Sequence, residues 1–182
     1  KITNDFNLYY DLTLTADSGS IVTVREERVA NIWIAPDGTG GSLRQLTRGS
    51  DKYEGTSGLR WTPDGKIVFV SGIGIARNIS IMNGDGGNPR QLTQTDGRDP
   101  AVSPDGRSIV FAGKGGIWQM GIDGGSPKQL TDKGNNPDIS TDGRWVVYNV
   151  GAGDGQGNRL WKVSIEGGEP VRLTDYRSPL PA

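Results

Sequence analysis

The sequence predicts an all-β fold, a β-propeller of about four four-stranded antiparallel blades, and three observations predict it. One unit recurs four times along the 182 residues. Each unit contains short β-branched and aromatic segments without a helical period. Glycine-rich turn signals separate these segments, and the 29 glycines are roughly twice the usual share of about 7%. A chain of many short strands joined by tight turns follows from this pattern.

The repeat is visible at two independent marks. The first mark is an apolar residue followed by threonine, at steps of 44, 46, 38 and 43 residues. Its threonines are Thr3, Thr47, Thr93, Thr131 and Thr174. The second mark is a turn aspartate, at steps of 47, 41 and 37 residues, and its members are Asp17, Asp64, Asp105 and Asp142. A period of roughly 40 residues with four strands per unit is the length of one propeller blade.

The third unit gives the expected strand order most clearly. The text "PAVS" leads through "PDGR" into "SIVFAG", and "GGIWQMGI" then leads through "DGG" into "SPKQLT". Pro104 presets the backbone angle of the turn and Gly106 accepts a positive φ, which closes a β-hairpin. In the first unit Ser18 stands between Asp17 and Gly19. We therefore expect a looser or bulged turn there.

Many predicted strands are apolar on both faces, as in "SIVFAG" and "WVVY". Sheets stacked face to face around an axis cover both faces of such strands. The expected blades cover about residues 11–47, 58–93, 100–131 and 138–174 of a single domain, 1–182. Residues 1–3 and 179–182 then read as partial strands of neighbouring blades. We accordingly expect an arc of a larger ring of six or more blades.

Composition excludes several classes of function. With 20 basic and 21 acidic residues the net charge is -1, which disfavours a nucleic-acid partner. The chain has no cysteine and no histidine, so a thiolate nucleophile, a disulfide framework and a Ser-His-Asp relay are excluded. No apolar run is long enough to span a bilayer. We expect no catalytic residue, no cofactor, no metal and no membrane insertion in this chain.

The order "SPDG", buried strand, "IW", "DGG" and "QLT" resembles the repeat of TolB-like β-propellers, which are similar to WD-type repeats. The resemblance covers nearly the whole chain, and it extends to the propellers of prolyl oligopeptidases, dipeptidyl peptidases and the tricorn protease. The wording of residues 2–38 is also similar to the propeller region attached to some bacterial serine/threonine kinases and regulators. The resemblance implies a periplasmic or other extracytoplasmic location, and it is specific for fold but not for function.

The four turn aspartates have a chemical and a structural interpretation. A ring of carboxylates could hold a cation or perform acid/base work. Their place just before a turn glycine favours a structural role instead, since an aspartate there bonds local backbone amides. The predicted turn residues are Asp17, Asp64, Gly65, Asp105, Gly106, Asp142 and Gly143. The texts "NGDGG" at 83–87 and "DGQGN" at 154–158 resemble calcium loops only weakly, and glycine-rich hairpin turns explain both.

The loops that do not repeat are the candidate recognition surface. Connections after strands two and four of each blade emerge on one face of a propeller, and here their sequences vary. Loops on a rigid scaffold commonly carry recognition, with tyrosine and arginine as favoured anchors. The predicted binding residues are Lys52, Tyr53, Glu54, Arg77, Arg98, Asp99, Asn135, Asn136, Tyr176 and Arg177. The alternative is that these residues form an ordinary solvated rim.

The sequence therefore predicts a noncatalytic module that binds a protein or peptide through its variable loops. Two alternatives remain: the substrate-gating propeller of a multidomain serine peptidase, and the ligand-sensing propeller of a membrane-anchored bacterial kinase. An open arc would expose apolar sheet faces. We therefore also expect two arcs to pair into a closed ring, with blade four of one chain against blade one of the other.

Overall fold

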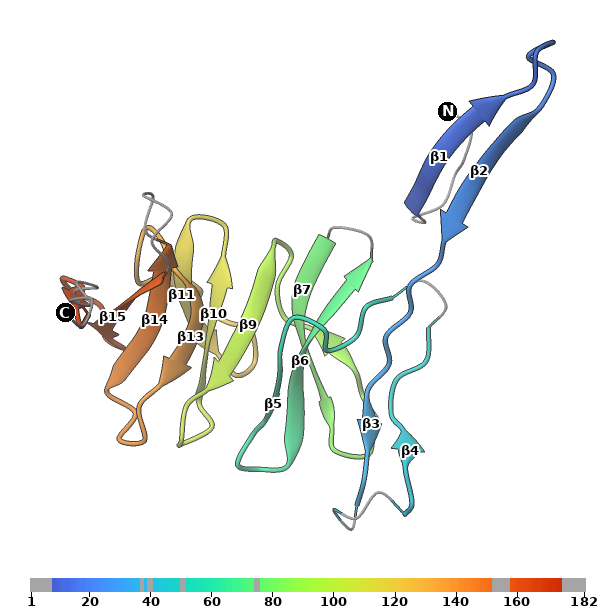
Figure 1. Cartoon of the computed structure of the whole chain (residues 1–182). Coiled ribbons are helices and arrows are strands. Elements are labelled where there is room, and N and C mark those ends of the chain that lie inside the picture. The colour runs from blue at the N-terminus through green and yellow to red at the C-terminus, as the bar shows by residue number, and fades with distance from the viewer. Residues whose placement is uncertain are drawn as a thin grey trace, which may run out of the picture.

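The computed structural model describes residues 8–36, 38, 41–49, 52–73, 76–151 and 158–174. Sixteen strands and no helix occur among these residues. Three four-stranded antiparallel sheets follow one another in sequence order and are stacked side by side as blades (Figure 1). The all-β propeller architecture expected from the sequence is confirmed.

Each complete blade has its four strands in meander order. Blade two contains β5 (Leu59–Trp61), β6 (Lys66–Ile73), β7 (Ala76–Asn83) and β8 (Arg90–Gln91). Blade three contains β9 (Gly97–Val102), β10 (Ser108–Gly113), β11 (Gly116–Gly121) and β12 (Lys128–Gln129). Blade four contains β13 (Asn135–Ile139), β14 (Trp145–Gly151), β15 (Asn158–Ser164) and β16 (Val171–Arg172). The outermost strand of each blade is only two residues long.

Blade one differs from the sequence expectation. Its four strands form two separate two-stranded sheets, β1 (Leu8–Leu14) with β2 (Ile21–Glu26), and β3 (Trp33–Ile34) with β4 (Arg44–Gln45). Figure 1 shows the β1–β2 hairpin projecting away from the stack, while β3 and β4 lie beside blade two. The connection between β2 and β3 spans residues 27–32, whereas that between β10 and β11 spans only 114–115. The longer connection does not force β2 back against β3.

The aspartate turns have one geometry in all four repeats. A hydroxyl two residues earlier donates to the aspartate Oδ1 at 2.5 to 2.6 Å. Its own oxygen accepts, at 2.8 to 3.0 Å, the N–H of the first residue of the following strand or, in the first unit, of the residue just before that strand. The hydroxyls are those of Thr15, Thr62, Ser103 and Ser140. The pKa of each carboxyl is lowered, at Asp64 mainly by the Lys66 ammonium and then by the Thr62 hydroxyl, and at Asp17 and Asp105 mainly by the hydroxyl bond. For Asp142 the Ser140 hydroxyl, with Arg144, lowers the pKa to about 2.

The looser turn expected in blade one does not occur. Ser18 takes the position that Gly106 takes in blade three, and it adopts a φ of 57°. Its N–H donates to the Thr15 carbonyl at 2.8 Å, as that of Gly106 does to Ser103. Serine can occupy the left-handed region at a steric cost of roughly 1 to 2 kcal/mol. The hydrogen-bonded hydroxyl and aspartate thus preserve the turn without glycine.

Side chains of the recurring "QLT" sequence hold the third and fourth strands of each blade together. In all four units the threonine Oγ1 accepts, at 2.8 to 3.0 Å, the N–H of a residue in strand three or, in blade one, of the residue just before it; the donors are Ile32, Ile79, Ile117 and Leu160. The glutamine side chain donates to the carbonyl of the same threonine in blades one to three. The threonines are Thr47, Thr93, Thr131 and Thr174. A two-residue strand is therefore held by side chains as well as by its backbone.

The basic residue before "QLT" joins each blade to the next one. Its side chain donates to the backbone carbonyl of the acidic residue in the following blade's second hairpin turn. The pairs are Arg44 with Asp85 at 2.8 Å, Arg90 with Asp123 at 2.7 Å and Lys128 with Glu166 at 2.6 Å. The repeat thus specifies contacts between blades as well as the structure within one.

The core lies between the blades rather than within them. Val68 and Val70 of β6 pack with Ile109 and Phe111 of β10, and all four are buried. A second cluster joins blades three and four and contains Ala101, Val110, Ala112, Ile117, Leu130, Val146, Tyr148 and Val163. Alternate residues of a strand therefore face opposite neighbours, which explains why the strands are apolar on both faces.

A β-bulge in the innermost strands is a repeat feature that the sequence interpretation missed. The residue six positions before each turn aspartate has a positive φ: Asp11 at 50°, Gly58 at 131°, Asp99 at 52° and Asn136 at 47°. Pairing is shifted at this place in β1, β9 and β13. Aspartate, asparagine and glycine are the residues that tolerate this conformation. The bulge re-aims the residues at the start of each inner strand.

Candidate binding face

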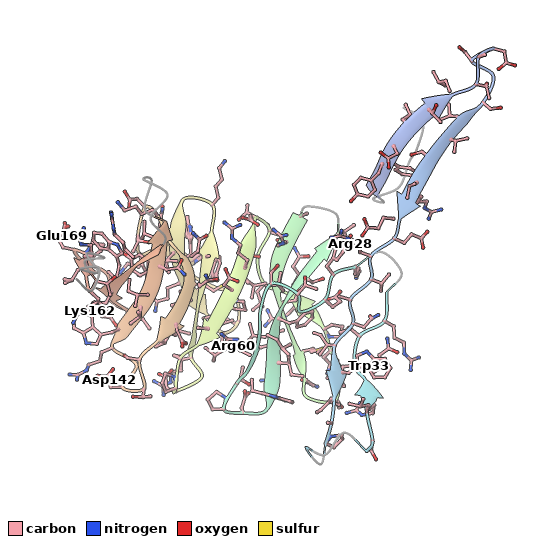
Figure 2. The ribbon with its side chains drawn as sticks, in the orientation of Figure 1. Arg28, Trp33, Arg60, Asp142, Lys162 and Glu169 are labelled. Atoms are coloured by element: carbon pink, nitrogen blue, oxygen red, sulfur yellow. The ribbon has the colours of Figure 1, made fainter. Side chains whose placement is uncertain are left out.

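The two edges of the stack differ in chemistry. Figure 1 places the turns after β5, β9 and β13 along the lower edge, and the end of β6 and the connection after β10 along the upper edge. Asp142 marks the lower edge in Figure 2. The lower edge repeats the same hydroxyl and aspartate pattern, whereas the upper edge carries the loops that do not repeat. We call the upper edge the variable-loop face, and its described residues begin the inner strands, lie at the end of β6 or the start of β7, or join β10 to β11.

Lys52 and Tyr53 lie where the chain enters blade two. Both are half-buried, and the Tyr53 N–H donates to the Gly72 carbonyl at 2.9 Å. On its other side this segment forms an isolated parallel bridge to Ala30. The pairing with Gly72 extends the inner edge of blade two beyond β5 toward the variable-loop face. It fixes the backbone that carries both side chains.

Glu54 is buried, with 7% of its surface exposed. The Ser71 hydroxyl donates to its Oε1 at 3.1 Å, and its Oε2 is buried without a hydrogen-bond partner among the described residues. Burial raises the pKa of the Glu54 carboxyl, which the Ser71 bond and the charge of Lys52 partly oppose. A buried acceptor without a donor costs roughly 1 to 3 kcal/mol. Glu54 is thus a buried acceptor site rather than a surface charge.

Arg98 and Asp99 are the second and third residues of β9, at its variable-loop end, and do not lie in a loop. Arg98 is half-buried opposite Ala112, and its Nε is hidden from solvent without an acceptor in the described part of the chain. Asp99 forms the bulge, and its N–H donates to the Ser57 carbonyl of the preceding blade at 2.7 Å. The bulge positions Arg98, and the bond from Asp99 ties the inner strands of blades two and three together.

Asn135 and Asn136 occupy the same place in β13, and both are exposed. Asn136 forms the bulge, with a φ of 47°. Arg77 lies on β7 opposite Gly72 and is exposed. Tyr176 and Arg177 lie outside the described residues. The described predicted residues therefore gather at one edge, but Glu54, Asp99 and Asn136 have identifiable structural roles there.

A groove beside the β10–β11 connection was missed by the sequence interpretation. It has a volume of about 360 Å³, and it is lined by residues 92–96 together with Phe111, Lys114, Trp118 and Met120. The Trp118 Nε1 donates to the Lys114 carbonyl at 3.1 Å, which fixes the indole along the groove. The sequence predicts Trp118 as a buried strand residue. Its position in the repeat therefore does not indicate a groove.

Other kinds of site can be checked over the same residues. No cluster of three or more acidic, histidine or cysteine side chains suited to a metal occurs within the described ranges. In the "NGDGG" sequence the Asp85 Oδ1 accepts the Gly87 N–H at 2.8 Å. This carboxylate therefore stabilises the hairpin turn in which it lies. Of the second calcium-like sequence, at 154–158, residues 154–157 lie outside the described residues. Over the described ranges, no helix has the length and apolarity needed to traverse a bilayer.

Comparison with known sequences finds related proteins, whereas no protein-family model matches the chain. An uncharacterised protein of Agrobacterium fabrum is 32% identical over 158 residues, which are 83% of this chain and 48% of that protein. YuxL of Bacillus subtilis, an uncharacterised peptidase, is 26% identical over 141 residues, 72% of this chain and 20% of that protein. The chain thus spans less than half of each relative.

Solved structures with a similar fold include two TolB proteins and a protease. A TolB candidate from Agrobacterium tumefaciens matches 93% of this chain and 62% of its own, with a TM-score of 0.65 and 23% identity. TolB from Acinetobacter baumannii matches 80% and 38%, with a TM-score of 0.64 and 24% identity. The tricorn protease matches 98% and 18%, with a TM-score of 0.62 and 17% identity. In fold, the chain is a TolB-like β-propeller arc.

Proposed function

We propose that this chain is a noncatalytic propeller module that binds a protein or peptide partner through the variable-loop face. The observation that carries the proposal is that Tyr53, Arg77 and Arg98 come together at one edge of the stack: Tyr53 bonds Gly72, Arg77 lies opposite Gly72, and Arg98 lies opposite Ala112. Loops and strand ends on a rigid scaffold commonly carry recognition, and tyrosine and arginine are favoured anchors at protein interfaces.

The surroundings of these residues support the same proposal. The inner strands are held by bulges and by the bond from Asp99 to Ser57, so the face is a rigid platform. Tyr53 is half-buried beside Glu54, and a tyrosine with one side exposed loses little conformational entropy on binding. Exposed lysine and arginine side chains at this face favour a partner segment with carboxylates.

The first test uses a displayed library of random twelve-residue peptides selected on the immobilised chain. We expect Arg98→Ala and Tyr53→Ala each to weaken binding of a selected peptide by roughly 1 to 4 kcal/mol. The matched control is Arg107→Ala, because Arg107 lies on the same β9–β10 hairpin but at its turn end. Binding is measured by calorimetry, and the melting temperature of each variant is measured beside it.

Three results would contradict the proposal. The library could yield no peptide that binds, Arg107→Ala could weaken binding as much as Arg98→Ala, or the two face variants could lower the melting temperature while binding stays intact. The last result would make Tyr53 and Arg98 structural residues of an ordinary solvated rim.

A second candidate function is a substrate-gating propeller of a multidomain serine peptidase. Its support is the likeness to YuxL and to peptidase propellers. This support is comparable in strength to that for the binding module. In that arrangement the catalytic residues would lie in another domain, because this chain has no histidine. The full open reading frame discriminates the two, since a hydrolase domain beside the propeller selects the gate and its absence selects the binding module.

Three further expectations belong with this proposal. An extracytoplasmic location is proposed from the resemblance to TolB-like propellers. Attachment to a kinase or regulator remains a prediction, for which a kinase domain in the same reading frame would be the test. The pairing of blade four with blade one of a second chain also remains a prediction.

A further inference from the structure

The β1–β2 hairpin exposes side chains whose counterparts are buried in blades two and three. Val22 and Val24 of β2 are 63% and 55% exposed. Counted from the turn, their counterparts are Val68 and Val70 in blade two and Val110 and Ala112 in blade three, all exposed by 1% or less. Two apolar side chains on one face of a strand, left exposed by all the described residues, form an unpartnered surface.

The interface between blade one and blade two lacks the strand that Val22 and Val24 would supply. The clusters between complete blades draw on strand two of the leading blade, as Val68 and Val70 do in β6. The cluster between β3–β4 and blade two contains Ile32, Leu46, Ile67, Phe69 and Met82. It contains no residue of β2, the second strand of blade one. A groove of about 360 Å³ lies there instead, lined by Ile32, Ile34, Leu46, Leu59, Trp61 and Ile67.

The groove also borders an open strand edge. Among the described residues β3 pairs only with β4, and β2 pairs only with β1. In every complete blade strands two and three pair with each other. Figure 1 shows the chain passing from β2 to β3 without turning back, and Figure 2 shows Arg28 on this passage and Trp33 on β3. The hairpin is therefore held away from the groove of its own chain.

We propose that the β1–β2 hairpin of one chain completes blade one of a second copy, by reciprocal strand exchange. Each copy carries both the apolar groove and the hairpin that fits it, so one two-fold axis satisfies both at once. Val22 and Val24 of the incoming hairpin fill the groove beside Ile32, and β2 pairs with the open edge of β3. This proposal is independent of the peptide-binding proposal, since it uses the first blade and not the variable-loop face.

The repeat predicts the register of the exchanged pair. Val22 corresponds to Val68, Val110 and Val147, because each lies two residues beyond the strand residue bonded to the turn hydroxyl. Ile34 corresponds to Ile81, Gln119 and Lys162, which lie two residues beyond the residue bonded to the "QLT" threonine. All three pairs are direct partners in the complete blades. Val22 of one copy should therefore lie opposite Ile34 of the other.

Disulfide trapping tests this contact cleanly because the chain has no cysteine. Directly opposite residues of antiparallel strands have Cα atoms about 4.5 to 5.5 Å apart, within the range of a disulfide. We expect the separate variants Val22→Cys and Ile34→Cys, mixed and mildly oxidised, to form a covalent heterodimer. The double variant Val22→Cys/Ile34→Cys should give a dimer with two disulfides. Light scattering of the unmodified chain should give about twice 19.5 kDa.

The control pair is Val147→Cys/Lys162→Cys, the counterpart positions in blade four, which should form an intrachain disulfide in a monomeric band. A monomeric intrachain disulfide between positions 22 and 34 would overturn the proposal, because the hairpin would then close its own blade. The absence of any 22–34 disulfide while the control forms would overturn it as well. The dimer should also be lost in Val24→Asp, whose side chain is exposed in the single chain and would be buried in the exchanged blade.

Discussion

Gly116→Ala is expected to destabilise the fold by about 3 kcal/mol or more. Gly116 opens β11 with a φ of 132°, a conformation that residues with a side chain rarely adopt. An added Cβ would lie 2.1 Å from the Thr131 carbonyl oxygen and 2.6 Å from the Lys133 nitrogen. Both atoms are backbone, in the segment that Thr131 locks to β11. The strand or the segment between blades must therefore move.

Urea denaturation followed by far-ultraviolet circular dichroism measures this loss. The matched control is Gly65→Ala, because Gly65 has a φ of 78° but no atom within 4 Å of an added Cβ. The control carries the conformational cost alone, roughly 1 to 2 kcal/mol. Equal losses in the two variants would show that crowding at Thr131 contributes nothing, and that the close approach of the segment to β11 is misplaced.

Tyr148→Ala should cost roughly 3 to 5 kcal/mol of unfolding free energy, in the range of large aromatic truncations. Tyr148 of β14 is 2% exposed and belongs to the cluster that joins blades three and four. Its ring lies against Gly134, where an added Cβ would come within 2.5 Å of the ring. Truncation leaves a cavity at the contact between two sheets, and the rigid strands can fill it only partly.

Tyr148→Phe is the control for this prediction. It keeps the ring and removes only the hydroxyl, so we expect a loss below about 1.5 kcal/mol. Guanidinium denaturation of both variants gives the comparison. A loss in Tyr148→Phe as large as in Tyr148→Ala would assign the effect to the hydroxyl and would contradict the packing account.

The fold follows from the sequence because its signals are local and recur. The turn at Asp105 needs only a hydroxyl two residues before it and a glycine after it, and both residues can be recognised in the amino-acid sequence. The bulge at Asp99 left a similar trace, since aspartate, asparagine or glycine stands at that place in every unit. That trace was overlooked because the segment read as a loop, although β9 begins at Gly97.

Blade one and Glu54 could not be predicted in this way. The strands of blade one have the same local pattern as those of the other blades, and only the missing pairing of β2 with β3 distinguishes them. Whether two strands pair depends on competing tertiary contacts, which no single segment encodes. Glu54 reads as a charged loop residue, yet the pairing of Tyr53 with Gly72 carries it into the interior beside Ser71. Its burial is a property of the folded chain alone.

The central claim is that the variable-loop face recognises a partner while the turn edge does not. The most direct measurement follows backbone amide signals by NMR as a peptide from the displayed library is titrated into the chain. The account predicts shifts at Arg98, Gly134 and Asn135 of the variable-loop face, with the turn glycines Gly65, Gly106 and Gly143 unchanged. Shifts confined to the turn glycines, or spread equally over both edges, would contradict it.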